Sequence, residues 1–263
     1  IFSKVNRSYA RERLAHAHPQ ALAELQERTR ALHAGHVKEL SSSFIDARDG
    51  NGGFRWHEDI KTGVSWDKTH YLRLPVIRRN DESDIKTVWE LSRFHFGIWL
   101  AQMEFITGES CHRELFIRLL DIWQLQNPYP LGPNWMCPMD VALRAINILA
   151  AIELFHATAP LPSPFLSAVY ASLYQHGVHI RANLEVVGSG LNTNHYLADL
   201  LGLLTLGKRF ECLPEAEEWM EFASRELERE IVAQTTDDGF CHESSACYHL
   251  MVAEYYLYAL MFC

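Results

Sequence analysis

Three segments of the chain carry more polar and aromatic groups than a helical scaffold needs. They are residues 132–140, which lead on to Arg144, residues 188–196, and residues 237–249. Each segment immediately precedes or opens an expected helix. Helices that alternate in direction along the chain would bring all three segments to the same end of a bundle, where their side chains could share a site.

The second segment places an amide and an imidazole, Asn194 and His195, at the expected start of a helix. Asn194 can cap that helix, or it can present its amide where the backbone dipoles favour an anion. His195 could equally be a histidine that is satisfied in the interior. Gly188 and Gly190 resemble part of a phosphate loop, but its third Gly, its Lys and its preceding strand are missing, so we predict no nucleotide site.

The third segment contains Tyr248, a side chain that can transfer a proton. Taken alone, Tyr248 is more typical of a core position, and Glu243 with the two serines after it fits the cap and first turn of a helix. There is no Gly-x-Ser-x-Gly sequence, so a serine hydrolase is not supported. A glycoside hydrolase would need two carboxylates about 5–10 Å apart, for which Asp140, Asp238 and Glu243 are the candidates.

The cysteines and histidines do not predict a metal site. None of the six cysteines lies in a Cys-x-x-Cys pair, and scattered cysteines in a chain with a large core are typically buried free thiols. Disulfides stay open if the protein is exported. His176 and His179 have an i,i+3 spacing that suits a metal, but the sequence offers no third ligand beside them.

The composition is that of a globular protein and excludes several partners. Of the 263 residues, 48% are hydrophobic and 22% are charged, which permits a sizeable core. Lys and Arg number 24 against 33 Asp and Glu, a net charge of -9 that argues against a nucleic-acid binder. No apolar run reaches the about 18–20 residues of a membrane span, and no signal-peptide pattern is present. The uncapped apolar end of the chain predicts a longer natural protein.

The hydrophobic spacing predicts an all-α protein. Residues 11–40 are rich in helix formers, whereas residues 41–75 predict a long ordered loop with short strands. Helices of 15–22 residues with short connections then predict stacked antiparallel hairpins, as in an (α/α) barrel or toroid. We divide the chain into residues 1–83, a helix and loop leading into the toroid, and residues 84–263, the toroid itself. The expected helix starts are Asp84, Cys111, Pro138, Pro164, Asn192–Asn194, Pro214 and Ser244.

Several short pieces of sequence occur in a recognisable order across about residues 55–263. They are Asp84-Ile85-Lys86, Trp89-Glu90-Leu91 with Arg93, Asn134-Trp135, Met139 to Arg144, Asn194 to Ala198, and Asp238 through Glu243-Ser244 to Tyr248-His249. Together they resemble the heparinase II/III family of polysaccharide lyases. The resemblance implies an incomplete (α/α) toroid followed by a β-sandwich domain. Nothing in this chain looks like that second domain, which would complete the cleft.

The resemblance also implies a mechanism, β-elimination at a uronic acid. Asn194 would hydrogen-bond the uronate carboxylate and stabilise an enolate-like intermediate, and His195 would assist. Tyr248 would be the general acid and, for some substrates, also the general base. Because the ordinary pKa of tyrosine is about 10, a base role needs positive charge or hydrogen bonds nearby. No metal and no organic cofactor are implied.

The expected substrate is an anionic polysaccharide such as a glycosaminoglycan or alginate. Trp135, and also Trp56 or Trp66, could stack on its sugar rings, or they could equally be buried core residues. The resemblance implies a periplasmic or secreted location, and a cytoplasmic one stays open. The residues expected to bind substrate are Asn134, Trp135, Arg144, Glu243 and His249.

Two other functions stay open at this point. The chain could be a non-catalytic carbohydrate-binding or polysaccharide-assembly protein that keeps the toroid. It could also be an (α/α)-toroid glycoside hydrolase that uses the carboxylates named above.

Overall fold

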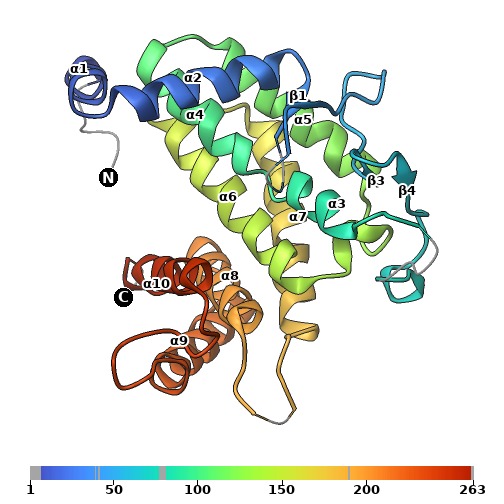
Figure 1. Cartoon of the computed structure of the whole chain (residues 1–263), viewed down its shortest axis with the longest axis vertical. Coiled ribbons are helices and arrows are strands. Elements are labelled where there is room, and N and C mark those ends of the chain that lie inside the picture. Colours follow the sequence, from blue (N-terminus) through green and yellow to red (C-terminus); the bar gives the residue numbers. More distant parts are fainter. Residues whose placement is uncertain (1–6, 39, 41, 77–80, 189, 262–263) are drawn as a thin grey trace. The chain divides into compact units, whose positions relative to one another are not determined.

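Helices make up most of the chain in the computed structural model, which describes residues 7–38, 40, 42–76, 81–188 and 190–261 (Figure 1). None of the described helices is both long and apolar enough to cross a membrane. The α-helices are α1 (Arg7–Ala17), α2 (Pro19–His33), α3 (Ile85–Ser92), α4 (His95–Thr107), α5 (Cys111–Gln126), α6 (Pro138–His156), α7 (Ser163–Ala182), α8 (Asn194–Arg209), α9 (Pro214–Gln234) and α10 (Ala246–Leu260).

Local sequence sets where most of these helices begin. The Asp84 carboxylate accepts the backbone N–H of Lys86 at 2.9 Å and caps α3. Thr193 and Ser245 cap α8 and α10 in the same manner. Prolines occupy the first positions of α2, α6 and α9, where a missing N–H costs no hydrogen bond. The predicted starts of the later helices therefore agree with the structure to within a few residues.

Two predicted helices are each broken into two. Pro19 separates α1 from α2, and the chain leaves the helix at Ala34 and Gly35 instead of continuing to residue 40. Phe94 separates α3 from α4 by adopting a left-handed backbone with φ 60°. This turn buries the Phe94 ring, which stacks on Trp56 with ring centres 5.5 Å apart. Tertiary packing thus overrides the helical spacing at Phe94.

Residues 42–76 form an ordered segment with short strands, as the sequence predicts. Strand β1 (His36–Val37) pairs antiparallel with β2 (Ile45–Asp46), and β3 (Glu58–Asp59) pairs antiparallel with β4 (Val64–Ser65). The 3-10 turns η2 (Tyr71–Arg73) and η3 (Pro133–Trp135) complete the elements. Phe54, Trp56 and Trp66 are all buried, so this segment is held down by aromatic packing.

The chain divides into two compact units. Unit 1 comprises Ile1–Met136 and Asn147–Val169, and unit 2 comprises Cys137–Ile146 and Tyr170–Cys263. Helix α6 therefore contributes its first half to unit 2 and its second half to unit 1. The boundary at residue 84 that the sequence suggests stays a prediction.

Helix α8 is the centre of unit 2. It packs against α9 and α10, and most of its side chains are buried. Gly202 lets it approach the first half of α6, because a Cβ at this position would lie 2.6 Å from the Cβ of Ala142. Gly177 similarly makes room for the ring of Trp219 between α7 and α9. Close packing of α8 on α6 brings the beginnings of these two helices together.

Candidate functional site

The first residue of α8, Asn194, binds a carboxylate. Its backbone N–H donates to Glu243 Oε1 at 2.7 Å, and its side-chain Nδ2 lies 3.0 and 2.8 Å from the two carboxylate oxygens. The side chain of Asn194 is buried, and the capping role falls to Thr193 instead. An amide and a helix N-terminus together hold an anion here, which is the alternative that the sequence offered for Asn194.

A second carboxylate, Glu185, orients His195. Glu185 Oε1 lies 2.9 Å from His195 Nδ1, and Glu185 Oε2 accepts the backbone N–H of Met139 at 2.8 Å. The backbone N–H of Glu185 in turn donates to Asp199 Oδ2 at 2.8 Å. The side chain of His195 is 42% exposed, so its ring is both held by a carboxylate and open to solvent. This arrangement suits a proton-transferring histidine.

Acidic groups gather beside this histidine. Burial, followed by the charge of Glu185, raises the pKa of Asp199 well above its usual range. Burial, followed by the charge of Asp140, raises the pKa of the Cys137 thiol. Carboxylates in such surroundings repel added negative charge, so this part of unit 2 favours protons and cations.

Arg144 is completely buried in unit 2. Its Nε donates to His176 Nε2 at 2.9 Å, which leaves His176 Nδ1 to donate to the carbonyl of Ser172 at 2.7 Å. Burial lowers the pKa of Arg144 to about 9, against the opposing charge of Asp140. Burial and the neighbouring guanidinium also lower the pKa of His176, which is therefore neutral. Arg144 is therefore a buried residue that pairs with His176, and its direct contact with substrate stays a prediction.

Tyr248 and His249 lie in the first turn of α10. The Tyr248 side chain is 46% exposed, so it is not the core residue that its local pattern suggests. His249 Nδ1 accepts the backbone N–H of Cys241 at 3.3 Å, and its ring stacks on Phe240 with centres 4.4 Å apart. His249 therefore holds the loop before α10, and Tyr248 is the group of this turn that solvent can reach.

Two residues expected to bind substrate, Asn134 and Trp135, are core residues of unit 1. Asn134 Nδ2 donates to the carbonyl of Trp56 and to Asn127 Oδ1, both at 2.8 Å. Trp135 has 1% of its surface exposed, and its Nε1 donates to the carbonyl of Asn127 at 3.2 Å. Trp56 and Trp66 are buried as well. The burial of these indoles agrees with the core alternative that the sequence left open for them.

The carboxylates proposed for a glycoside hydrolase have other partners. Asp238 accepts hydrogen bonds from Thr236 Oγ1 at 2.6 Å and from the backbone N–H of Phe240 at 3.3 Å, so it closes its own turn. Glu243 is engaged by Asn194 as described above. A glycoside-hydrolase site built on Asp140, Asp238 and Glu243 stays a prediction.

The expectation of buried cysteines is half right. Among the described cysteines none forms a disulfide; Cys137 and Cys241 are buried, whereas Cys111, Cys212 and Cys247 are exposed. Cys263 lies outside the described residues.

Unit 1 has a hollow of its own. A cavity of about 600 Å³ is lined by residues of α2, the β1–β2 hairpin and α5, among them Arg48 and Arg118. None of the site residues expected from the sequence lies along it. The predicted chemistry is concentrated in unit 2 instead.

A sequence model described as Heparinase II/III N-terminus matches residues 3–262. The chain belongs to the heparinase II/III family. A search of curated proteins finds no match. The family assignment that the short sequence pieces suggested is therefore confirmed.

Solved structures of heparinases share the fold of this family member. Heparan sulfate lyase HepC from Pedobacter heparinus matches with a TM-score of 0.67 at 18% identity, over 91% of this chain and 34% of that one. A structure titled Heparinase III-BT4657 gene product matches with a TM-score of 0.55 at 21% identity, over 72% and 32% of the two chains. At these identities the likeness shows the fold alone, and it confirms the helical toroid portion. The chain spans about a third of the length of these structures.

Within this heparinase-family chain, sequence reasoning missed the groups that surround His195. Glu185 follows α7 and lies ten residues before His195, with no spacing that marks it as a partner. Asp199 gave a usable signal, because it lies at i,i+4 from His195 and so shares its face of α8. Cys137 lies within the segment 132–140 that the sequence analysis singled out, but its approach to Glu185 depends on tertiary packing.

Proposed function

We propose that this chain supplies part of the catalytic site of a polysaccharide lyase that cleaves a uronic-acid-containing polymer by β-elimination. The observation that carries the proposal is the carboxylate held by Asn194 at the start of α8. A backbone N–H and an amide that together bind one carboxylate offer what a uronate group needs. The family membership supports the same reaction class.

Elimination needs the uronate carboxylate to accept negative charge. The C5 proton is hardly acidic until hydrogen bonds stabilise the enolate-like intermediate that forms when it leaves. The NH₂ group of Asn194 has two donors, and one N–H can serve both oxygens of Glu243. The second N–H, or the whole site once Glu243 moves aside, would bind the substrate. Glu243 thus acts as the positioning residue of Asn194.

Proton transfer falls to His195 and Tyr248. A carboxylate at Nδ1 holds the proton on that nitrogen, which leaves Nε2 of His195 as an acceptor in the neutral ring. In the reaction the C5–H electron pair forms the C4–C5 double bond as the C4–O4 bond breaks. His195 would take the proton from C5, and Tyr248 would donate its phenolic proton to the departing O4. Where Tyr248 performs both steps, it would begin as the phenolate, take the C5 proton and pass that proton to O4.

The remainder of the lyase site belongs to the proposal as well. The solved relatives continue well beyond the matched third of their length. We assign completion of the cleft to a C-terminal β-sandwich domain, and a periplasmic or secreted location to the protein. Arg144 would offset the negative charge of Asp140 inside unit 2.

The decisive experiment is Tyr248→Phe in a form of the protein extended to the length of its relatives. Heparan sulfate, hyaluronan, alginate and bacterial exopolysaccharides are screened for unsaturated products that absorb in the near ultraviolet. Removing one proton donor typically costs about 10²–10⁴-fold in rate, so the variant should lose product formation on the polymer that the parent cleaves.

Tyr258→Phe is the matched control, since Tyr258 lies on the same helix and outside the described contacts of Asn194 and His195. It should retain activity. A fully active Tyr248→Phe protein would exclude Tyr248 from the chemistry. Oligosaccharide binding without any unsaturated product would instead support the non-catalytic carbohydrate-binding alternative.

A further inference from the structure

A thiol, a carboxylate and an imidazole meet where α6 and α8 begin. The Cys137 sulfur lies 3.9 and 3.8 Å from the two carboxylate oxygens of Glu185, and His195 Nδ1 lies 2.9 Å from Glu185 Oε1. One donor atom from each residue lies within 4.8 Å of the other two. All three residues belong to unit 2.

These separations suit a tetrahedral zinc ion. Bonds of about 2.0–2.3 Å to nitrogen, oxygen and sulfur place the donor atoms of such an ion about 3.3–3.8 Å apart. The two separations that involve Glu185, 3.8 and 2.9 Å, differ from that range by less than about half an ångström, and the Cys137 sulfur lies within 4.8 Å of the His195 nitrogen. Thiolate and imidazole together select zinc over the hard ions magnesium and calcium, which prefer oxygen ligands alone.

A neighbouring acidic group is an independent sign that a cation belongs here. Asp199 Oδ1 is buried, and no described residue donates a hydrogen bond to it, although Oδ2 accepts the backbone N–H of Glu185. Asp199 is fully buried, and the charges of Glu185 and Asp140 both act on it. A buried carboxyl oxygen without a partner is costly, and a divalent cation beside Glu185 would relieve the accumulated negative charge.

We propose that Cys137, Glu185 and His195 form a zinc site. Three protein ligands leave the fourth position of the ion for water or a substrate oxygen. Zinc on Nδ1 replaces the bond to Glu185 and keeps the ring proton on Nε2, so His195 would then donate a hydrogen bond and could no longer accept a proton. Only this effect on activity depends on the proposed lyase function, since the metal site itself stands on the three donor atoms.

The test is calorimetric titration of the metal-free, reduced chain with zinc alone. His33, Cys111 and His112 form a second group of metal-binding side chains in unit 1, so the titration uses a His33→Ala background. We expect one ion per chain. Cobalt, added as a spectroscopic substitute for zinc, should give a thiolate-to-metal charge-transfer absorption in the near ultraviolet.

Two variants and one control then locate the ion. Cys137→Ala should abolish the charge-transfer absorption and weaken zinc binding at least about 10–100-fold, as the loss of even a supporting group does at metal sites. Glu185→Gln keeps an acceptor for the Met139 N–H and should weaken binding similarly. Cys241→Ala removes another buried thiol of unit 2 and should bind zinc like the parent.

The outcomes separate the metal site from the lyase proposal. No zinc binding in the His33→Ala background, or unchanged binding in both folded variants, would overturn the site. Circular dichroism checks that each variant folds. If Cys137→Ala does not fold, zinc binding by Glu185→Gln alone decides whether the site exists. Loss of the elimination reaction in a separate assay would overturn the lyase function and leave these calorimetric results unaffected.

Discussion

Among single residues, His57 makes folding depend on pH. Burial, helped by the charge of Lys68, lowers its pKa to about 4 from the ordinary 6.5. As the pH falls from 6.5 to about 4, the unfolded chain binds a proton that the folded chain does not. The stability contributed by neutral His57 is thus complete above pH 6.5 and falls by up to about 3 kcal/mol on acidification to pH 4.

Urea unfolding between pH 5 and 7.5 measures this contribution. A His57→Leu protein should show a smaller fall in the free energy of unfolding over that range than the parent, because the titrating group is gone. His16→Asn, a change at an exposed histidine of α1, should leave the slope unaltered. Equal pH slopes in the parent and His57→Leu would show that His57 takes up its proton in the folded state.

The role of a single residue could be predicted only where its partner lies nearby in the sequence or a known family pattern marks it. Asn194 and Tyr248 were singled out because a helix start and the family pattern mark them. The structure places Asn194 on the Glu243 carboxylate and leaves Tyr248 exposed, and their catalytic roles stay a prediction. Trp135 is of a residue type that often stacks on sugar rings, yet here it is buried and its Nε1 donates to the Asn127 carbonyl. Glu185 gave no signal, since its contact with His195 exists only once α7 and α8 are packed.

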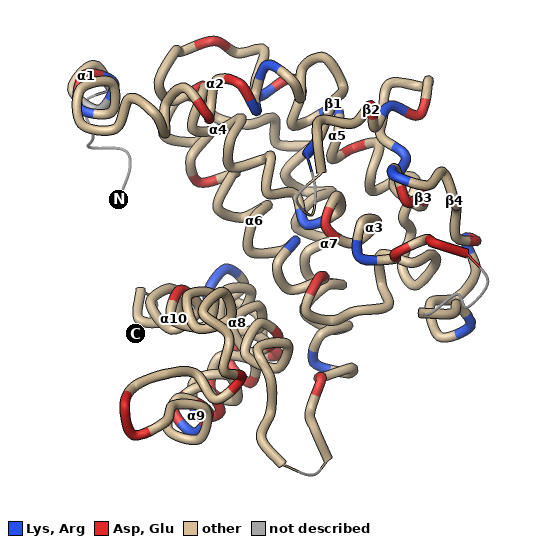
Figure 2. Tube along the Cα trace, in the orientation of Figure 1, with Lys and Arg blue, Asp and Glu red and all other residues tan. Residues whose placement is uncertain are grey.

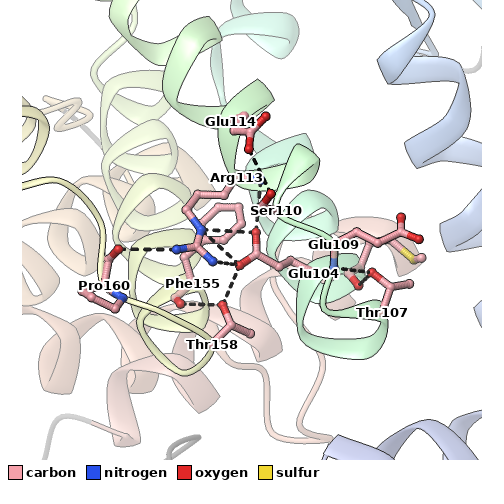
Figure 3. A network of polar contacts seen from close by, with 10 residues as sticks. Glu104, Thr107, Glu109, Ser110, Arg113, Glu114, Phe155, Thr158 and Pro160 are labelled. Atoms are coloured by element: carbon pink, nitrogen blue, oxygen red, sulfur yellow. Dashed lines mark hydrogen bonds and ion pairs between the residues drawn. The ribbon is translucent and has the colours of Figure 1, made fainter.

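At the scale of helices, a buried ion pair ties α4 to α5 (Figure 3). Glu104 on α4 is 1% exposed and pairs with the Arg113 guanidinium, while Thr158 Oγ1 donates to Glu104 Oε1 at 2.7 Å. Arg113→Ala leaves this buried carboxylate without its cation. Breaking such a pair costs about 3–5 kcal/mol, which should appear as a lower free energy of unfolding in urea.

Two comparisons test this explanation. The Arg181–Glu218 pair is largely exposed, so Arg181→Ala should cost at most about 1 kcal/mol. Replacing both Glu104 and Arg113 by Leu and Met should recover most of the loss, because no charge is then buried alone. Similar costs for the two arginine variants would mean that Glu104 is hydrated after the change.

Elements were predictable where local chemistry decides them. Caps such as Asp84 and Thr193 and prolines such as Pro138 act within one helical turn, so their effect can be read without tertiary information. The break at Phe94 could not be predicted in this way. Its left-handed backbone is unfavourable locally and is offset by stacking on Trp56, a residue 38 positions earlier in the chain.

At the scale of the whole molecule, the distribution of charge bears on the substrate. Acidic and basic residues are both scattered along each unit (Figure 2), and α9 carries seven Glu against two Arg. The net charge is -9, and the described groups around Asn194 and His195 include Glu185 and Glu243. A site of this kind would recognise a carboxylate through directed hydrogen bonds, since the field around it does not attract polyanions.

This charge distribution predicts a preference for uronate polymers of low sulfation. Calorimetry with the chain should show tighter binding of hyaluronan or alginate oligosaccharides than of heparin oligosaccharides of equal length. A binder that uses 6–10 contacts between basic side chains and phosphates loses about 10³–10⁵ in affinity from 50 to 200 mM salt, because bound counterions are released. Here the affinity should change less than about tenfold, since salt also screens the repulsion between the polymer and the acidic protein. Affinity that rises with sulfation and collapses in salt would require a basic surface, and would place substrate recognition away from Asn194.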